Sequence, residues 1–137
     1  MPLFGPEDVI FRYTRKDAIR DGVLIDLSQG ELGILMKQMG FLHPTAMTDT
    51  AFKLYVQVPP EMRQAGQTES DRLRPILKSL GMAVMARNQK GSRDEILIFG
   101  FQATTEDNRP TQGRLKAIGG PDDDGNPCVT IMLPNED

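Results

Sequence analysis

The amino-acid sequence predicts an α+β protein in which a C-terminal antiparallel meander of three strands packs against helices. Two spacings of apolar residues indicate this class. Between about residues 28 and 86, apolar side chains recur three and four positions apart, which is typical of amphipathic helices. From Glu95 onward they alternate with polar side chains, as in half-buried strands. The chain has 137 residues and is 39% hydrophobic. A chain of this size buries roughly two thirds of its unfolded surface, so we expect a single domain over residues 1–137.

The first expected elements are a strand, a short helix and a second strand. Residues 9–13 are rich in β-branched and aromatic side chains, which favour a strand. Thr14 and Asp17 have the spacing of a capping pair for a helix that ends at Gly22, because glycine readily adopts the left-handed conformation that follows many helices. Residues 23–27 alternate between more and less apolar side chains, which predicts the second strand.

Two helices are expected in the middle of the chain. Ser28 and Glu31 have the spacing of a capping box that opens a helix, and Gly40 ends it. The apolar stripe of this helix consists of Leu32, Leu35, Met36 and Met39. After an extended connector over residues 41–44, Thr48 is the expected N-cap of the next helix, which ends before a pair of prolines.

The longest helix is expected at about residues 71–86, after a polar loop over residues 61–67. Thr68 and Asp71 can cap it, and large aliphatic side chains recur along it at helical spacing. Pro75 conflicts with a helix interior, where proline removes a hydrogen bond and costs about 3 kcal/mol. The conflict is smaller if a later residue such as Asp71 is the cap, because Pro75 then lies near the first turn.

Three strands are expected in the last third of the chain, at residues 95–102, 114–119 and 128–133. A loop over residues 104–112 and a turn over residues 119–127 join them. Consecutive strands usually lie beside each other, so the simplest topology is an antiparallel meander with helices over one face.

Two motifs, one near each end of the chain, resemble a known family. The first runs from Ile10 to Asp26 and follows the pattern I-x-x-Y-T-R-x-x-A-I-x-D-G-V-L-x-D. The second runs from Leu115 to Pro134 and follows L-K-A-x-x-G-P-x-D-D-G-x-P-x-x-T-I-M-L-P. Together they resemble DUF6573, a family of small bacterial, plasmid and prophage proteins. The resemblance implies residence on mobile elements, where small non-enzymatic proteins often block host defence complexes or modulate the element's own machinery.

Composition narrows the function further. The chain has 16 basic and 19 acidic residues and a net charge of −3, whereas proteins that bind the phosphate backbone usually carry a clustered basic stripe, so direct nucleic-acid binding is not expected. Cys128 is the single cysteine, which fits a reducing compartment. No signal-peptide pattern and no run of roughly 18 to 20 apolar residues is present. We therefore expect a soluble cytoplasmic protein without membrane contact.

The densest polar cluster is a run of three aspartates: Asp122, Asp123 and Asp124. With Asn126 it resembles the start of a calcium loop, which takes oxygen ligands from alternate residues. The resemblance ends there, because Pro127 occupies the position of the required glycine and Leu133 that of the final glutamate. Asp-Gly is also a strong hairpin signal, so we expect an exposed turn that holds no calcium. The three aspartates are also the candidate partner-binding residues, as an acidic contact surface.

The sequence assembles no catalytic site, and no cofactor or metal is expected. His43 is the single histidine, and no Gly-x-Ser-x-Gly pattern presents a serine nucleophile. One enzymatic alternative stays open, because the segment that begins with Arg12 faintly resembles the opening of NAD-dependent ADP-ribosyltransferases. Arg12 would hold the nicotinamide ribose there. No Glu-x-Glu pair follows on a late strand, where Thr130 is the available side chain.

Two further groups of residues allow a structural and a functional interpretation. The local basic group is expected on a solvated helix face, with nucleic-acid contact as the alternative. It consists of Arg12, Arg15, Lys16 and Arg20. Four methionines on apolar stripes are expected to fill the core rather than to line an adaptable binding groove. They are Met36, Met39, Met82 and Met85.

By elimination, the sequence favours a protein that works by binding. We expect a non-enzymatic accessory protein of a mobile genetic element that acts as an anti-defence inhibitor, with anti-CRISPR activity as one form. It would dock stoichiometrically on a protein partner such as a host defence nucleoprotein complex. The alternatives are an ADP-ribosyltransferase-like modifying enzyme and a plasmid or prophage regulator that binds nucleic acid. The oligomeric state stays open.

Overall fold

Five strands of the described residues form one mixed sheet. The computed structural model describes residues 13–92, 94–104 and 109–136. The strands are Leu24–Asp26 (β1), Thr45–Thr48 (β2), Ile96–Thr104 (β3), Pro110–Pro121 (β4) and Pro127–Met132 (β5). Their order across the sheet is β1-β2-β5-β4-β3. The β2–β5 pair is parallel, and the other neighbouring pairs are antiparallel.

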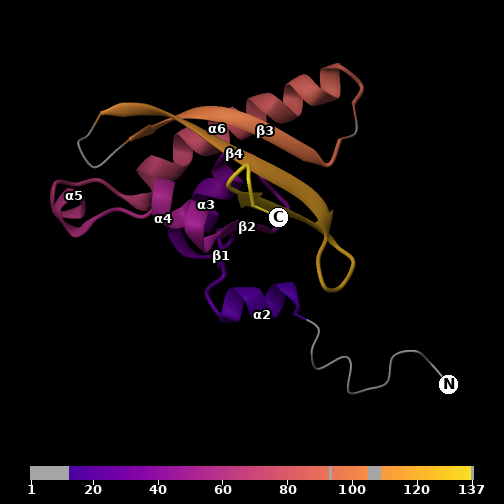
Figure 1. Ribbon diagram of the computed structural model, residues 1–137, viewed down its shortest axis with the longest axis horizontal. Helices are drawn as coiled ribbons and strands as arrows, with labels where there is room; N and C mark the ends of the chain where they lie inside the picture. The colour runs from indigo at the N-terminus through magenta and orange to yellow at the C-terminus, as the bar shows by residue number, and fades with distance from the viewer. Residues whose placement is uncertain (1–12, 93, 105–108, 137) are drawn as a thin grey trace.

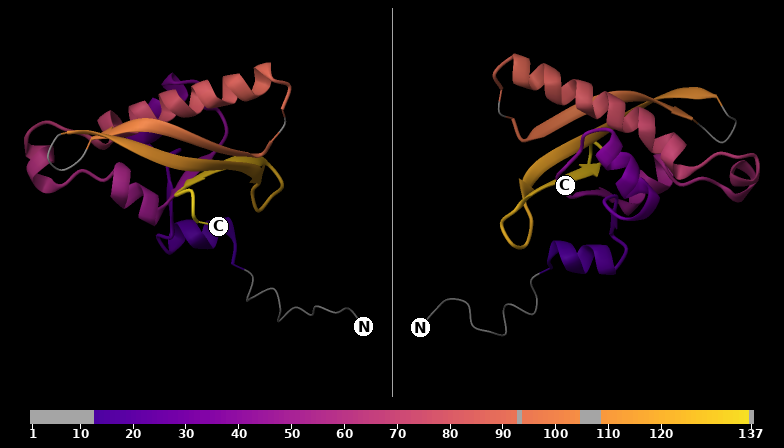
Figure 2. Two further views of the ribbon diagram at one scale, coloured as in Figure 1. Left: turned by 45° about the horizontal axis from the view of Figure 1, so that its top comes forward. Right: turned by 180° about the vertical axis from the view of Figure 1, so that it is seen from behind.

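The principal helices lie on one face of this sheet. The helices are Arg15–Arg20 (α2), Gly30–Gln38 (α3), Asp49–Tyr55 (α4), Pro60–Gln64 (α5) and Glu69–Gln89 (α6). Both α3 and α6 lie behind the sheet in Figure 1 and in front of it in the reversed view of Figure 2. None of the helices in the described residues has the length and apolar character required to cross a membrane.

The α+β class is confirmed, but the sheet has five strands instead of the three of the expected meander. β3, β4 and β5 are consecutive antiparallel neighbours. However, β1 and β2 extend the same sheet to five strands, and β2 runs parallel to β5. β2 was missed because its first three residues are all buried, so it lacks the alternation of a half-exposed strand.

The inward face of the sheet supplies one side of the core. Leu97, Ala117, Ile131 and Met47 form a row across four strands. Phe99 and Phe101 lie further along β3 on the same face, and the ring of Phe101 meets Tyr55 of α4 edge-on at a centroid distance of 4.9 Å. The other side of the core is the buried stripe of α6, whose members are Leu73, Ile76, Leu77 and Leu80.

Three predicted N-caps are confirmed, and one is wrong. The side chains of Thr14, Thr48 and Thr68 each accept a hydrogen bond from a backbone N–H in the first turn of α2, α4 and α6. The predicted cap of α3 was Ser28, but its hydroxyl accepts from the backbone N–H of Thr45 at 2.9 Å, and Gln29 takes the cap position. Ser28 therefore joins two segments of the chain instead of capping a helix.

Several element boundaries also differ from the expectation. α6 begins at Glu69, so Pro75 lies inside it, flanked by buried side chains whose packing offsets the lost hydrogen bond. The expected polar loop over residues 61–67 contains α5, with Pro60 in its first turn. β4 begins at Pro110, inside the expected loop over residues 104–112. Residues 9–12 of the first expected strand lie outside the described residues.

The end of the chain is fastened to the outward face of the sheet. Glu136 accepts hydrogen bonds from the hydroxyls of Thr48 and Thr50 at 2.7 and 2.8 Å and from the Leu133 N–H at 2.8 Å. Burial raises the pKa of Glu136, but these hydrogen bonds and the nearby Lys116 outweigh it, so the pKa lies below its usual value. The Lys116 ammonium group also donates to the Glu136 carbonyl oxygen. This tail covers the β2 and β5 side of the outward face.

Candidate functional site: an apolar groove

A groove opens between the second half of α6, the segment that follows α3, and the inward face of the sheet. Its volume is about 520 Å³. Pockets of roughly 300–1,000 Å³ are typical of small-molecule sites, and a groove of this size also accepts one or two large apolar side chains. The groove is therefore large enough for a small molecule or an apolar side chain.

The groove has a buried floor and an exposed apolar rim. Leu80, Ala117 and Cys128 line it and are almost fully buried. The rim side chains of Leu42 and Met85 are 84% and 63% exposed. Large exposed apolar side chains next to a cavity mark interaction sites more often than single ones scattered over a surface.

Two glycines keep the groove open. A Cβ built on Gly119 would meet only the Glu95 carbonyl oxygen within 4 Å, at 3.9 Å, so no side chain of the described residues fills this space. A Cβ on Gly81 would lie 3.9 Å from the ring of Phe41, which packs on α6 where the glycine leaves it room. Residues with side chains at both positions would narrow the groove without a severe clash.

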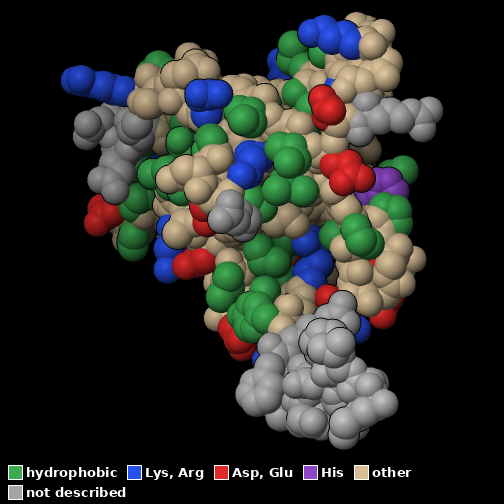
Figure 3. Space-filling view, turned by 45° about the vertical axis from the view of Figure 1, so that its right-hand side comes forward, with side chains coloured by type: hydrophobic (Ala, Val, Ile, Leu, Met, Phe, Trp, Pro, Cys, Tyr) green, Lys and Arg blue, Asp and Glu red, His purple; other side chains and the backbone are tan. Residues whose placement is uncertain are grey.

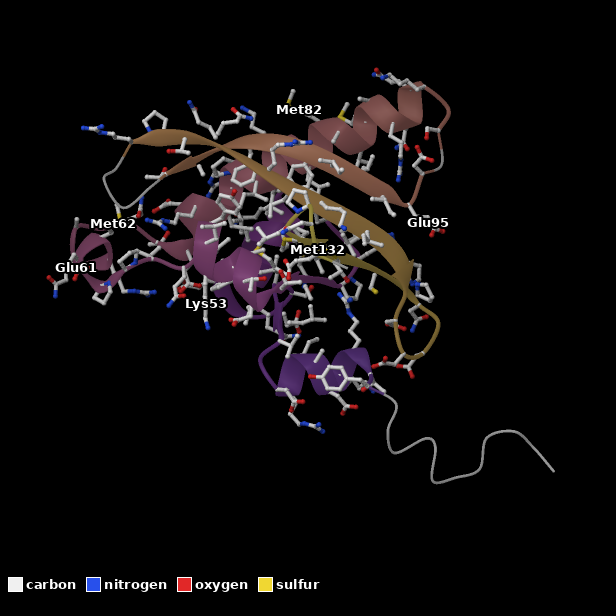
Figure 4. All side chains as sticks on the ribbon, viewed as in Figure 1. Lys53, Glu61, Met62, Met82, Glu95 and Met132 are labelled. Atoms are coloured by element: carbon white, nitrogen blue, oxygen red, sulfur yellow. The ribbon has the colours of Figure 1, made fainter. Side chains whose placement is uncertain are left out.

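One acidic residue lines the groove, at the point where β3 begins. Glu95 lines the groove, is exposed, and projects from the start of β3 in Figure 4. Gly120 and Pro127, which flank the acidic hairpin turn, line it as well. One basic residue, Arg87, donates to the Asp94 carbonyl oxygen at 2.9 Å. His43, also exposed, completes the lining from the segment after α3.

The three aspartates of the turn have three different environments. Asp122 is half-buried and accepts backbone hydrogen bonds from Asp124 and Asn126, both at 2.9 Å, so it shapes the turn. Asp123 accepts from the backbone N–H groups of Arg15 and Lys16 at 2.9 and 3.0 Å. Asp124 is exposed. Of the three, Asp124 is the one whose surroundings leave it most available to a partner.

Asp123 joins the hairpin turn to the first turn of α2, and its loss should change the surroundings of this turn. The two N–H groups belong to the first turn of α2, where an anion is favoured. These hydrogen bonds hold the pKa of Asp123 below its ordinary value. The contact is therefore complete above the ordinary aspartate pKa of about 3.9 and is lost as the pH falls through the lower folded-state pKa.

We expect Asp123→Ala at neutral pH to shift the amide NMR resonances of Arg15 and Lys16 in the same direction that acid shifts them in the natural protein. Asp124→Ala, which changes the exposed neighbour, is the matched control and should leave both resonances in place. Unchanged resonances in Asp123→Ala would show that the contact does not hold α2.

Within the described part of the N-terminal basic group, Arg15 and Arg20 have partners, whereas Lys16 is exposed. Arg15 donates from its guanidinium to the Thr130 hydroxyl at 2.5 Å and to the Val129 carbonyl oxygen at 2.9 Å, which corrects its expected place on a solvated face. Arg20 pairs with Asp17 at 3.1 Å. On the face drawn in Figure 3, Lys and Arg side chains are dispersed among acidic and apolar ones.

The residues of the transferase hypothesis are not brought together by the described part of the chain. Arg12 lies outside the described residues. Thr130 on β5 is engaged by Arg15. Among residues 13–92, 94–104 and 109–136, no group of three or more His, Cys, Asp or Glu side chains could hold a metal ion.

Two of the four methionines expected in the core are exposed on α6. Met36 is buried and Met39 half-buried, as expected of core residues, but Met82 and Met85 are each 63% exposed. A signal was available for Met82: at 3.6 residues per turn it lies about 200° from Leu80 around the helix. Exposed methionines adapt to varied partners, so Met85 at the groove rim fits a contact surface better than core filler.

Comparison with known proteins gives one match. A model of DUF6573, described as a family of unknown function, matches residues 1–137, the whole chain. No curated protein and no solved structure matches the chain.

Proposed function

We propose that this chain, which belongs to the DUF6573 family, acts without catalysis by binding a protein partner in the apolar groove. The observation that carries the proposal is the combination of a buried floor with the exposed rim residues Leu42 and Met85. A partner side chain that enters the groove would be desolvated on all sides, which is the setting in which a few interface residues carry most of the binding energy.

The surroundings of the groove favour a partner whose apolar anchor lies next to basic residues. Glu95 is exposed in the groove lining, and the whole chain has a net charge of −3. Complementary charge accelerates association and suppresses wrong partners, while the apolar anchor supplies affinity. A protein surface that normally receives nucleic acid offers such basic residues.

The biological role that we propose is inhibition of a host defence nucleoprotein complex, with CRISPR effectors as one form of target. The support is the basic surface of such complexes, which complements Glu95 and the negative net charge of the chain, together with the mobile-element setting that the sequence motifs imply.

A phage infection assay tests this role. Bacteria that carry single defence systems, CRISPR systems included, express the protein and are challenged with phage. We expect the natural chain to restore infection against at least one system. The control variant Leu54→Lys should restore it as well, because Leu54 is 57% exposed on α4 and lies outside the groove lining. Leu42→Lys should fail to restore it. If neither the natural chain nor any variant restores infection against any of the systems, the anti-defence role is contradicted.

A further inference from the structure

β3 forms a long open edge of the sheet. It pairs with β4 on one side, and no strand among the described residues pairs with the other. Its nine residues, Ile96–Thr104, include no charged residue and no proline. The nine pairs with β4 are consecutive, so no bulge interrupts the strand. Soluble proteins usually protect such an edge with a lysine, a proline, a bulge or a cover, and β3 has none of the first three.

The opposite edge of the same sheet is protected. β1 has three residues and carries Asp26, whose side chain accepts from the Ser28 N–H at 2.9 Å. A short strand that carries a charge offers little to a pairing strand. The contrast between the two edges indicates that the open β3 edge is a contact surface.

The register shows which groups the open edge offers. The Gly119 N–H donates to the Glu95 carbonyl oxygen at 2.8 Å, so odd-numbered residues of β3 exchange hydrogen bonds with β4. The N–H and C=O groups of the even-numbered residues therefore face the free edge. They belong to Ile96, Ile98, Gly100, Gln102 and Thr104. The first four of these residues are exposed, and Thr104 is half-buried.

We propose that this edge pairs with β3 of a second copy of the chain, so that two five-stranded sheets join into one. Two β3 strands can pair with each other, because antiparallel pairing places residues of one β3 opposite residues of the other. None of these residues is charged, so no like charges oppose each other. Two molecules with a net charge of −3 can meet there without like charges in contact. Pairing also limits the assembly to two copies, because the β3 edge of each copy is then paired. The edges that remain free are the short, charged β1 strands.

α6 supplies a second surface beside the strand. Its C-terminal half extends past β3 on the side away from β4 (Figure 1). Met82 projects from this part of the helix at the top of Figure 4, and it is 63% exposed. In a two-fold pair this half of α6 would lie over the β3 strand of the second copy. Backbone pairing would then be joined by apolar contact, as a stable dimer requires.

Measurement of mass against concentration tests the dimer. We expect the natural chain to sediment at twice its 15.2 kDa, with slow amide exchange at Ile98, Gly100 and Gln102 in the dimer and fast exchange on dilution. Ile98→Lys places like charges near the two-fold axis and should raise the dimer dissociation constant at least about tenfold. The matched control is Ile34→Lys on α3, since Ile34 and Ile98 are 59% and 52% exposed, and it should leave the dimer intact.

Three results would overturn the proposal: a monomer up to millimolar concentration, a dimer in which these amides still exchange fast, or growth beyond two copies. Protection of the amides by another protein, in a chain that is monomeric alone, would assign the edge to that partner and reject the second copy. Leu42→Lys separates this inference from the proposed function. Leu42→Lys should abolish partner binding and leave the dimer unchanged. Ile98→Lys should weaken the dimer and leave partner binding in the groove unchanged.

Discussion

Leu42→Lys should weaken binding to the target that the infection assay identifies by at least about 30-fold, which corresponds to the 2 kcal/mol or more of an interface hot spot. Leu42 is 84% exposed at the rim of the groove, so folding does not depend on its burial. A lysine there removes the apolar contact and places a positive charge opposite the basic residues expected on the partner. Isothermal titration calorimetry with the purified target measures the change.

The control for this variant is Leu54→Lys, which makes the same substitution at an exposed leucine on α4. Both variants should keep the circular dichroism spectrum of the natural protein. Gly119→Leu adds a test of the opposite kind, because it fills the groove where a Cβ meets nothing closer than 3.9 Å. If Leu42→Lys and Gly119→Leu both bind as tightly as the natural chain, the groove is not the contact site.

Leu115→Ala should lower the free energy of unfolding by about 2–5 kcal/mol, the usual cost of a cavity at a fully buried leucine. Leu115 has no exposed surface and lies on β4, opposite Phe99 of β3. Urea denaturation at fixed protein concentration measures the loss. Leu54→Ala, the same change on the surface, should stay within about 0.5 kcal/mol of the natural chain. A loss below about 1 kcal/mol in Leu115→Ala would contradict the core described above.

The parts of the fold that follow from local chemistry could be predicted from the sequence. Thr14 with Asp17, and Thr68 with Asp71, cap helices through contacts three residues apart, and the sequence displays such spacing directly. Ser28 has the same spacing to Glu31, but its hydroxyl accepts a hydrogen bond from the backbone N–H of Thr45, which is distant in the sequence. β2 depends on a parallel pairing with β5, more than 80 residues away, and no local pattern encodes that choice.

The candidate site was harder to predict, because the groove draws on α6, the segment after α3, and four strands. The aspartate turn was correctly placed in a hairpin, but the backbone contacts of Asp123 join segments more than 100 residues apart. Met85 was expected in the core, and Leu42 in an extended connector. Their exposure depends on where the second half of α6 leaves the sheet, and this is a property of tertiary packing.

The central claim is that the protein acts by stoichiometric binding without chemical change to its target. The most direct measurement is a titration of target activity with the purified protein in the presence of NAD, followed by intact-mass spectrometry of the target. We expect inhibition to saturate at one chain per binding site, with the target mass unchanged. Inhibition by far fewer chains than targets, together with an added ADP-ribose mass, would make the protein an enzyme and contradict the account.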